Sequence, residues 1–373
     1  MLRLYGFTLN KLADFIKEQN LSIIVYGAGM IGKIIIPDYL KRNGLQKYVR
    51  FYIDADVHKQ GKYIQIGSTW YPIYSLEHLE EVKTDSIIII TNSNFLPVLN
   101  YLDSLGNLDG TKAVIFPVLQ TLEADSRIEK YQICEKSSEL IPKVINYCWF
   151  SGREMPEYLQ KCIDSWKRYC PDYEIRRWDE SNYDITKNQY MQEAYSEEKW
   201  GFVPDFARLD ILYNYGGFYI DTDVELIRPL DELREELAFC GVEKWGNINM
   251  GGCSGAVAHH PMIKKLLNYR KNIHFKYSDG SLNPDTCGIY ETAPFLEEGM
   301  RADNTVQRIN GMTIFSSDFF HPYDYMSGQT IITENTVSIH HFNGDWLSDE
   351  ARKNRIKTGE MYSNIVKRMD NNW

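Results

Sequence analysis

Short apolar runs alternate with helical patterns along the first third of the chain. The runs at residues 21–26, 49–53, 86–91 and 112–116 are continuous and bounded by polar segments, which is typical of strands buried on both faces. Strands separated by helical segments predict βαβ units and a parallel sheet. We therefore expect a small Rossmann-like domain over residues 1–120.

A second α/β pattern follows a charged, mixed segment at residues 121–140, which we interpret as a linker. The second pattern starts with a strand at residues 141–149, a helix at 157–168 and a strand at 174–178. The predicted fold class is therefore α/β throughout, with a second domain over residues 141–373.

Composition and charge narrow the class of protein. The chain has 373 residues and a formal net charge of −10, without any run of Lys and Arg. Nucleic-acid binding needs a basic surface, so a nucleic-acid partner is not expected. An acidic protein that binds an anionic ligand needs local cations or a divalent metal ion.

Cysteine usage and hydropathy indicate the compartment. The seven cysteines are scattered and form no Cys-x-x-Cys pair, which is typical of free thiols in a reducing compartment. No uninterrupted apolar stretch of about 20 residues is present, so we expect neither a signal peptide nor a membrane span. The expected location is the cytoplasm, with peripheral membrane contact left open.

A glycine motif follows the first strand. Gly27, Gly29 and Gly32 form a G-x-G-x-x-G that opens a helix, and Asp54 ends the next strand. This arrangement is typical of a nucleotide site, with the pyrophosphate at the helix N-terminus and the carboxylate on a ribose. The alternative is that the motif only packs a helix against the sheet. An NAD-dependent nucleotide-sugar dehydrogenase or epimerase is the corresponding alternative function, although no hydride-transfer constellation is visible.

A carboxylate pair ends an apolar strand in the second domain. If the strand runs continuously from Phe218 to Glu225, then Tyr219, Asp221 and Asp223 share one face. Two carboxylates on one face repel each other unless a cation or a proton intervenes. Mg²⁺ or Mn²⁺ prefers oxygen ligands and keeps positions open for diphosphate oxygens. The sequence therefore predicts a divalent-metal site here.

The preceding helix adds two charged residues. Asp205 and Arg208 are three positions apart and are neighbours on one helix surface. Gly216 and Gly217 then turn the chain from this helix into the Asp strand. An Asp-x-Asp string or an Asp–Arg pair alone is usually a surface feature. Their combination in this order indicates one functional cleft.

Residues 141–346 resemble the bacterial capsular-polysaccharide type of sugar transferase with a DXD motif (glycosyltransferase family 32). The matching segments are Ile141–Lys143, Trp149–Phe150, Cys162–Trp166, Cys170–Glu174 and Phe202–Asp223. The resemblance implies a GT-A fold, with Mn²⁺ or Mg²⁺ bridging the DXD carboxylates and the donor diphosphate.

The same resemblance implies roles for individual residues. Asp223 would bind the metal directly, Asp221 the ribose and metal, and Asp205 and Arg208 the donor sugar. Tyr219 would line the nucleotide pocket. Trp149 would stack on the base, although packing at a strand end is an equal alternative.

The C-terminal part of the site rests on a similar comparison. The segment Ser338–Trp346 looks like the terminal metal-ligand segment of several retaining GT-A transferases, which implies that His341 is a third metal ligand and that Trp346 contacts the donor. In a continuing strand His340 would point the other way. Asn249 lies in a glycine-rich stretch and either binds the donor sugar or belongs to a packed turn.

These features together predict a glycosyltransferase that moves a hexose from a nucleoside diphosphate sugar to an acceptor hydroxyl. The expected donor is a UDP-hexose, with GDP-mannose as the alternative. The expected acceptor is an oligosaccharide or a lipid-linked oligosaccharide of a surface polysaccharide. Retention of the anomeric configuration follows from the resemblance. A catalytically inactive scaffold for capsule assembly is a further alternative.

Overall fold

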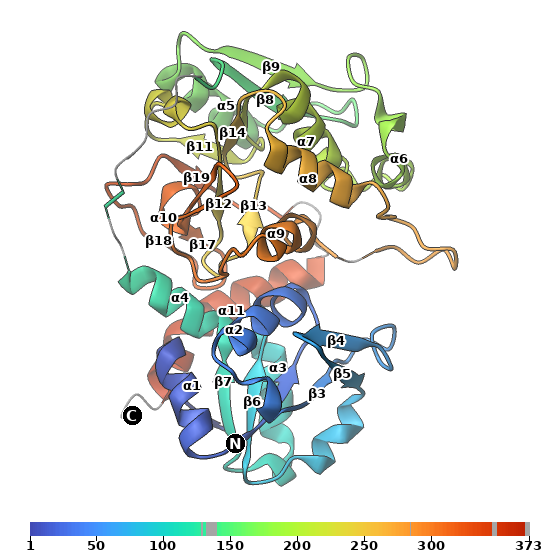
Figure 1. Ribbon diagram of the computed structural model, residues 1–373, viewed down its shortest axis with the longest axis vertical. Coiled ribbons are helices and arrows are strands. Elements are labelled where there is room, and N and C mark those ends of the chain that lie inside the picture. Colours follow the sequence, from blue (N-terminus) through green and yellow to red (C-terminus); the bar gives the residue numbers. More distant parts are fainter. Residues whose placement is uncertain (128–129, 132–139, 284, 345–348, 370–373) are drawn as a thin grey trace. The chain divides into compact units, whose positions relative to one another are not determined.

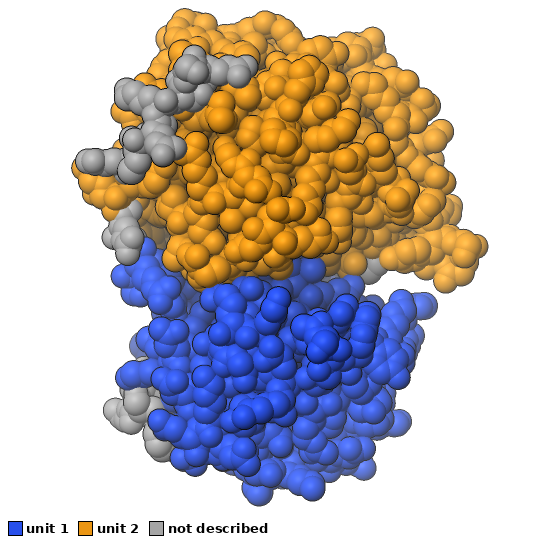
Figure 2. Space-filling model, in the orientation of Figure 1, with its two compact units in different colours: residues 1–127, 324–329, 348–373 blue, residues 128–323, 330–347 orange. Residues whose placement is uncertain are grey.

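The computed structural model divides the chain into two compact units (Figure 2). Unit 1 contains residues 1–127, 324–329 and 348–373, and unit 2 contains residues 128–323 and 330–347. The sequence analysis assigned all of residues 141–373 to the second domain, so the grouping of the C-terminal segment with unit 1 differs from that expectation. The structure describes residues 1–127, 130–131, 140–283, 285–344 and 349–369.

Unit 1 is built on a seven-stranded sheet with the order β1-β7-β6-β2-β3-β5-β4 (Figure 1). All neighbouring strands are parallel except β4 and β5, which form an antiparallel hairpin that the sequence analysis did not predict. The strands are β1 (Arg3–Leu4), β2 (Ser22–Tyr26), β3 (Val49–Ile53), β4 (Tyr63–Ile66), β5 (Thr69–Tyr74), β6 (Ser86–Ile90) and β7 (Lys112–Ile115).

The central strands of unit 1 are buried on both faces. Ile87 to Ile90 have no exposed surface, which explains their uninterrupted apolar sequence. The helix that the glycine motif was expected to open starts as a π-helical turn at Ile31–Ile35. Helix α4 extends into the predicted linker. The helices are α1 (Leu9–Glu18), α2 (Ile36–Arg42), α3 (Phe95–Ser104), α4 (Phe116–Ser126) and α11 (Asp349–Arg368).

Unit 2 contains an eight-stranded mixed sheet with the order β15-β16-β12-β14-β10-β8-β9, and β13 pairs with β12. Strands β9, β8 and β10 are parallel, and β14 is antiparallel to β10 and β12. The predicted α/β class is therefore confirmed in both units. The strands are β8 (Val144–Cys148), β9 (Glu174–Trp178), β10 (Gly217–Tyr219), β12 (Ala238–Val242), β13 (Ile248–Asn249), β14 (Ser254–Ala256), β15 (Gln307–Ile309) and β16 (Met312–Phe315).

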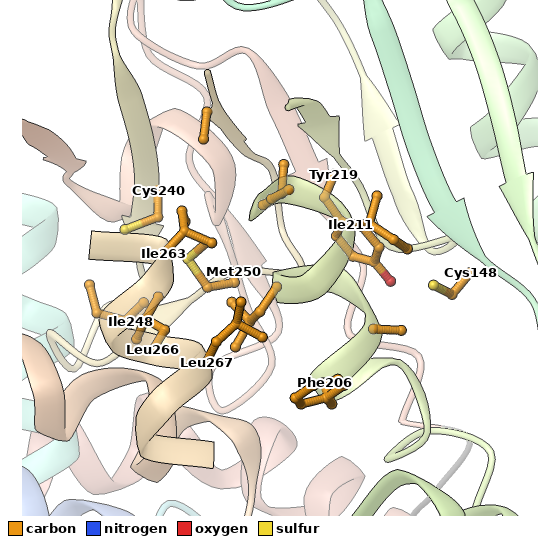
Figure 3. Packing of buried hydrophobic residues seen from close by; sticks show 14 of the residues in the cluster. Cys148, Phe206, Ile211, Tyr219, Cys240, Ile248, Met250, Ile263, Leu266 and Leu267 are labelled. Carbon is orange, nitrogen blue, oxygen red and sulfur yellow. The ribbon is translucent and has the colours of Figure 1, made fainter. Parts of the chain in front are cut away.

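The larger core cluster of unit 2 lies around two of its helices. Figure 3 shows Phe206 and Ile211 of α7 close to Ile263, Leu266 and Leu267 of α8, and all five belong to one buried cluster. This packing fixes α7 and therefore the charged residues on it. The helices are α5 (Glu157–Tyr169), α6 (Gln189–Ser196), α7 (Pro204–Tyr215), α8 (Pro261–Arg270), α9 (Cys287–Glu297) and α10 (Ser317–Phe320).

Two small sheets complete the described fold. Strand β11 (Val224–Leu226) pairs antiparallel with β19 (Ser338–His340), and β17 (Tyr323–Asp324) pairs with β18 (Gln329–Thr330). In the described part of the chain, every helix is too short or too polar to cross a bilayer. The six cysteines that the structure describes are free thiols.

Candidate active site

Helix α7 places Asp205 and Arg208 on one buried face. Proline stands in the first turn of the helix, where no N–H is needed. Arg208 Nη2 lies 3.2 Å from Asp205 Oδ1, and the two side chains are only 4% and 3% exposed. This pair is therefore an interior ion pair, and burial excludes the solvated salt bridge that the spacing alone would also allow.

Gly216 and Gly217 connect α7 directly to β10. Their φ angles are 66° and 91°, a region that favours glycine. A Cβ atom on Gly217 would lie 2.7 Å from the carbonyl oxygen of Val144, so the close approach of β8 also requires glycine there. The strand returns along the helix, which brings the residues after β10 to Arg208.

The Asp221-Thr222-Asp223 segment is a turn. The sequence analysis expected one strand from Phe218 to Glu225, but β10 ends at Tyr219 and β11 begins at Val224. The Val224 N–H donates to the Asp221 carbonyl at 3.1 Å, which closes a four-residue turn. The prediction that Tyr219, Asp221 and Asp223 share one strand face is therefore wrong, and the two carboxylates have different neighbours.

Asp221 is bound by Tyr219 and Arg208. The Tyr219 hydroxyl donates to Asp221 Oδ1 at 3.1 Å, and Arg208 Nη2 lies 3.4 Å from Oδ2. The Arg208 guanidinium also lies over the Tyr219 ring, 5.5 Å from its centroid. The Asp221 side chain is 25% exposed, so it can still reach a ligand.

Two further charged residues complete the cluster around Arg208. Glu291 Oε1 of α9 lies 3.3 Å from Arg208 Nη1, and Arg270 Nη2 of α8 lies 2.9 Å from Asp205 Oδ2. The Arg270 guanidinium packs between the rings of Tyr190 and Tyr290. Two guanidinium groups thus face three carboxylates: Asp205, Asp221 and Glu291.

The electrostatics of the cluster follow from burial and pairing. Burial alone would lower the pKa of Arg208, but Asp221, Asp205 and Glu291 raise it well above its ordinary value. Burial raises the pKa of Glu291 to about 7, although Arg208 acts in the opposite direction. Arg208 is therefore permanently charged, and its positive charge offsets the repulsion between these three carboxylates.

Asp223 lies against a buried histidine. His340 Nε2 lies 3.3 Å from Asp223 Oδ1, and the Asn343 N–H donates to Oδ2 at 3.1 Å. Burial opposes ionisation, but His340 and the Asn343 N–H lower the pKa of Asp223 to about 2. Burial also lowers the pKa of His340, but Asp223 raises it above its ordinary value. Asp223 is therefore an anion at neutral pH and is 18% exposed.

The structure places His340 at Asp223, where the sequence analysis expected His341. His341 Nε2 instead lies 3.1 Å from Glu225 Oε2. In the antiparallel pairing of β11 with β19, His340 lies opposite the buried Val224. The strand ends at His340, and Phe342 then adopts a φ of 48° and stacks on the His340 ring. The imidazole that meets the DXD turn is therefore one residue earlier than expected.

The other residues expected to bind the donor differ in exposure and in their hydrogen bonds. Trp149 follows β8, is partly exposed, and donates its indole N–H to the Arg153 carbonyl at 2.8 Å. Asn249 is buried, and its Oδ1 accepts from the N–H groups of Gly251 and Gly252. For Asn249 the packed-turn alternative thus describes its contacts. Trp346 lies outside the described residues.

The turn after β13 packs against Asp221 and accepts a hydrogen bond from its backbone. The Asp221 N–H donates to the Gly251 carbonyl at 2.8 Å. A Cβ atom on Gly251 would lie 1.9 Å from Asp221 Oδ2, so only glycine leaves room for the carboxylate. Asn249 shapes this turn, and its own amide donates to Glu243 at 2.9 Å.

Residues 156–240 match the family model described as "Glycosyltransferase sugar-binding region containing DXD motif". The match runs from the start of α5 to β12 and includes Asp205, Arg208 and the Asp221–Asp223 turn. This part of the chain is therefore similar to DXD-type glycosyltransferase sugar-binding regions.

Two curated relatives of the chain carry the names of a mannosyltransferase and of a mannosyl-lipid synthase. Inositol phosphoceramide mannosyltransferase 3 of Schizosaccharomyces pombe is 31% identical over 166 residues, which cover 40% of this chain and 44% of the relative. Mannosyl phosphorylinositol ceramide synthase CSH1 of Saccharomyces cerevisiae is 32% identical over 164 residues, which cover 40% of this chain and 42% of the relative. The chain thus spans less than half the length of these relatives.

Solved glycosyltransferase structures are similar at low identity. The PaToxG glycosyltransferase matches with 16% identity and a TM-score of 0.34, over 49% of this chain and 73% of its own.

The glycine motif of unit 1 lies outside the sugar-binding region. The Asp54 carboxylate, which is the expected ribose ligand, accepts from the Ala28 N–H at 2.7 Å and lies 3.1 Å from Lys59 Nζ. A Cβ atom on Gly32 would lie 2.0 Å from the Gly27 carbonyl oxygen. These contacts are those of the alternative in which the motif packs a helix against the sheet.

Two substitutions test the packing role of this glycine motif. We expect Gly32→Ala to lower the free energy of unfolding by about 2 kcal/mol, because the new methyl group would overlap backbone. Gly29→Ala should leave stability within about 0.5 kcal/mol, because no atom lies within 4 Å of its Cβ position. Urea unfolding of both variants measures this difference. Equal losses of stability would contradict it.

The contact between His340 and Asp223 gives a second test, at the Asp221–Asp223 turn. His340→Gln should weaken Mn²⁺ binding by about tenfold, the effect typical of losing an outer-shell partner, because His340 orients Asp223. His341→Gln should leave Mn²⁺ affinity unchanged within about twofold, because its partner Glu225 lies outside the cluster. Electron paramagnetic resonance of free Mn²⁺ measures both affinities. A larger effect at His341 would restore the original assignment.

Proposed function

We propose that this protein is a metal-dependent glycosyltransferase that moves a hexose from a nucleoside diphosphate sugar to an acceptor hydroxyl. The observation that carries the proposal is the turn at Asp221–Asp223. Its two carboxylates are partly exposed, and Asp221 contacts the buried Arg208. The match of residues 156–240 to a DXD sugar-binding region supports the same reading.

The residues at this turn fit a divalent metal ion. Asp221 and Asp223 offer hard oxygen ligands, which Mg²⁺ and Mn²⁺ prefer. Within the described residues, no group of three or more His, Cys, Asp or Glu side chains is placed to hold a metal ion, so the protein ligands proposed here are these two carboxylates. A site with one or two protein carboxylates leaves positions for diphosphate oxygens, as is usual where Mg²⁺ meets a nucleotide. The bound ion would supply charge neutralisation of the leaving diphosphate.

The chain's own residues set the geometry of the reaction. Tyr219 and Arg208 fix the two oxygens of Asp221, and His340 with the Asn343 N–H fixes Asp223. Arg208 was expected to bind the donor sugar, but it is 4% exposed and is bonded to three carboxylates. Its role in the proposal is therefore to hold Asp205 and Asp221 in place. Such preorganisation reduces the reorganisation that the transition state requires.

The sugar and acceptor are proposed from the relatives. The sequence analysis expects a UDP-hexose, and mannosyl transfer in the names of both relatives makes GDP-mannose the second donor to test. Both names also contain an inositol-phosphate ceramide, which supports a lipid acceptor for this chain. Cytoplasmic action at a membrane surface is proposed from the sequence alone. A role in surface-polysaccharide synthesis belongs to the same proposal.

A donor-hydrolysis screen tests the proposed function. Purified full-length protein is incubated with UDP-glucose, UDP-galactose, UDP-N-acetylglucosamine and GDP-mannose, with Mn²⁺, with Mg²⁺ and with EDTA. The expected result is release of nucleoside diphosphate from one donor, with loss of release in EDTA. Turnover that is unaffected by EDTA, or turnover of NAD in place of every sugar donor, would overturn the proposal.

The stereochemical part is tested separately. Retention is proposed because the chain resembles retaining transferases. Proton NMR of the sugar released or transferred should show the donor's anomeric configuration in the first product formed. An inverted product would reject retention and leave glycosyl transfer standing.

A further inference from the structure

Glu291 is a buried carboxylate in α9 that belongs to the Arg208 cluster. Its side chain has no exposed surface. The sequence around it, Ile289-Tyr290-Glu291-Thr292-Ala293, is that of an ordinary packed helix and lies outside the matched sugar-binding region. Burying a charged side chain to this degree costs free energy unless the charge is paired and hydrogen-bonded. The partners of Glu291 therefore indicate its role.

The two oxygens of Glu291 bind two different parts of the site. Oε1 lies 3.3 Å from Arg208 Nη1, and Oε2 accepts from the Met250 N–H at 2.9 Å. Met250 directly precedes Gly251, whose carbonyl accepts from the Asp221 N–H. Arg208 in turn lies 3.4 Å from Asp221 Oδ2. Glu291 therefore supports Asp221 by two routes, one through a guanidinium and one through the backbone.

We propose that Glu291 is a positioning residue that holds both Arg208 and the 250–252 turn so that Asp221 is presented to the metal and donor. This inference rests on the proposed function. A positioning role predicts that Glu291 acts through Asp221 and Arg208 without touching the substrate itself.

The carboxylate suits this position because it accepts on both oxygens. A glutamine of the same shape has one acceptor oxygen and one donor nitrogen, so it can satisfy either Arg208 or the Met250 N–H. Glu291→Gln also leaves Arg208 with one carboxylate fewer. The guanidinium then interacts more strongly with Asp221 and competes with a metal ion for that carboxylate.

The test compares Glu291→Gln with a matched neighbour. Thr292 is the next residue of α9, and its Oγ1 accepts from the Ile248 N–H at 2.9 Å, so Thr292→Val removes a buried bond to the same segment without touching Arg208. Both variants of the full chain are assayed at pH 8, above the pKa of about 7 for Glu291. We expect Glu291→Gln to lower kcat for donor hydrolysis by about 10- to 100-fold, as small misplacements at a reacting centre do. Thr292→Val should keep kcat within about twofold, since it lies outside the cluster.

A second measurement isolates the route through Arg208. Adding Glu291→Gln to an Arg208→Lys background should lower kcat by less than about threefold further, because residues that act as a unit are not additive. Independent, multiplicative losses would exclude the route through Arg208 and so overturn the proposal that Glu291 holds both Arg208 and the 250–252 turn. So would a Glu291→Gln variant that loses thermal stability but keeps kcat, since that result describes a structural residue only.

Mn²⁺ binding distinguishes failure of this inference from failure of the proposed function. In the absence of any donor, Glu291→Gln should weaken Mn²⁺ binding about threefold to tenfold by paramagnetic resonance, whereas Thr292→Val should not. Absence of turnover in the wild-type protein rejects the proposed function, and the Mn²⁺ titration still decides the role of Glu291. Equal Mn²⁺ affinities of the wild type and Glu291→Gln would overturn that role.

Discussion

Replacing Asp223 with alanine is expected to lower metal-dependent donor hydrolysis by at least about 10³-fold, equivalent to several kcal/mol of transition-state stabilisation. Asp223 is held as an anion by His340, which lowers its pKa to about 2, and its side chain is partly exposed. No other carboxylate is oriented by this histidine in the described structure. The rate of nucleoside diphosphate release at saturating Mn²⁺ measures the effect.

The control for Asp223 is two residues away. Glu225→Ala removes the same charge from the adjoining strand β11, where the side chain is 44% exposed and contacts His341. Its activity should stay within about twofold of wild type, as is usual for exposed pairs. Asp223→Asn keeps the side-chain volume and should be as inactive as Asp223→Ala. An active Asp223→Asn variant would show that the ionised carboxylate is dispensable.

Replacing Arg208 with methionine is expected to lower the free energy of unfolding by about 3–5 kcal/mol, the cost typical of removing one partner of a buried ion pair. The substitution removes the ion pairs that Arg208 makes with Asp205, Asp221 and Glu291. Arg270, which is paired with Asp205, is then the guanidinium that is left in the cluster. Donor hydrolysis should also be lost, because Asp221 loses the group that fixes Oδ2. Urea unfolding followed by tryptophan fluorescence gives the stability.

The control for Arg208 is an arginine near the surface. Arg176 of β9 pairs with Glu174, and its side chain is 34% exposed. Arg176→Met should cost no more than about 1 kcal/mol, as screened pairs do. Where Arg208→Met yields too little folded protein, Arg208→Lys keeps one charge and should still reduce activity, because an ammonium group lacks the guanidinium fork. Comparable stabilities of Arg176→Met and Arg208→Met would contradict the buried-cluster interpretation.

The elements with strong local signals could be predicted from the sequence. The apolar run at residues 49–53 coincides with β3, and α7 ends just before Gly216, where the glycine pair was expected to turn the chain. The neighbourhood of Asp205 and Arg208 also follows from helix geometry, and their ion pair is present at 3.2 Å. These features depend on residues only a few positions apart.

The direction in which side chains point at the site could not be predicted in the same way. Apolar alternation continues through Ile220, Asp221, Thr222 and Asp223 as if the strand were unbroken, but the Asp221 N–H bonds to Gly251, thirty residues later, in place of a strand partner. The exchange of His341 for His340 has a similar origin, because the register with β11 sets which imidazole faces inward. Long-range partners of this kind leave no periodic signal.

Glu291 and Arg270 were missed for a different reason. Each stands in or at the end of a helix whose other residues are those of ordinary core packing, and each meets its partner across a gap of more than sixty positions. A single charged residue in such a helix has several explanations, of which a surface position is the commonest. Only the fold shows that both are buried beside Arg208.

The membership of α11 in unit 1 has a consequence for how the protein is made. Arg368 lies 2.7 Å from Asp103, and the Thr358 hydroxyl donates to Asn94 at 2.7 Å, so this helix packs on a unit whose other elements are almost all encoded before residue 128. A ribosome releases those residues long before it reaches position 349. The nascent first unit must therefore wait for the whole of unit 2 to be synthesised before its last helix arrives, and during that interval the surface that α11 covers is open to chaperones. Unit 2, whose described strands and helices end with β19 at His340, is complete before α11 is synthesised.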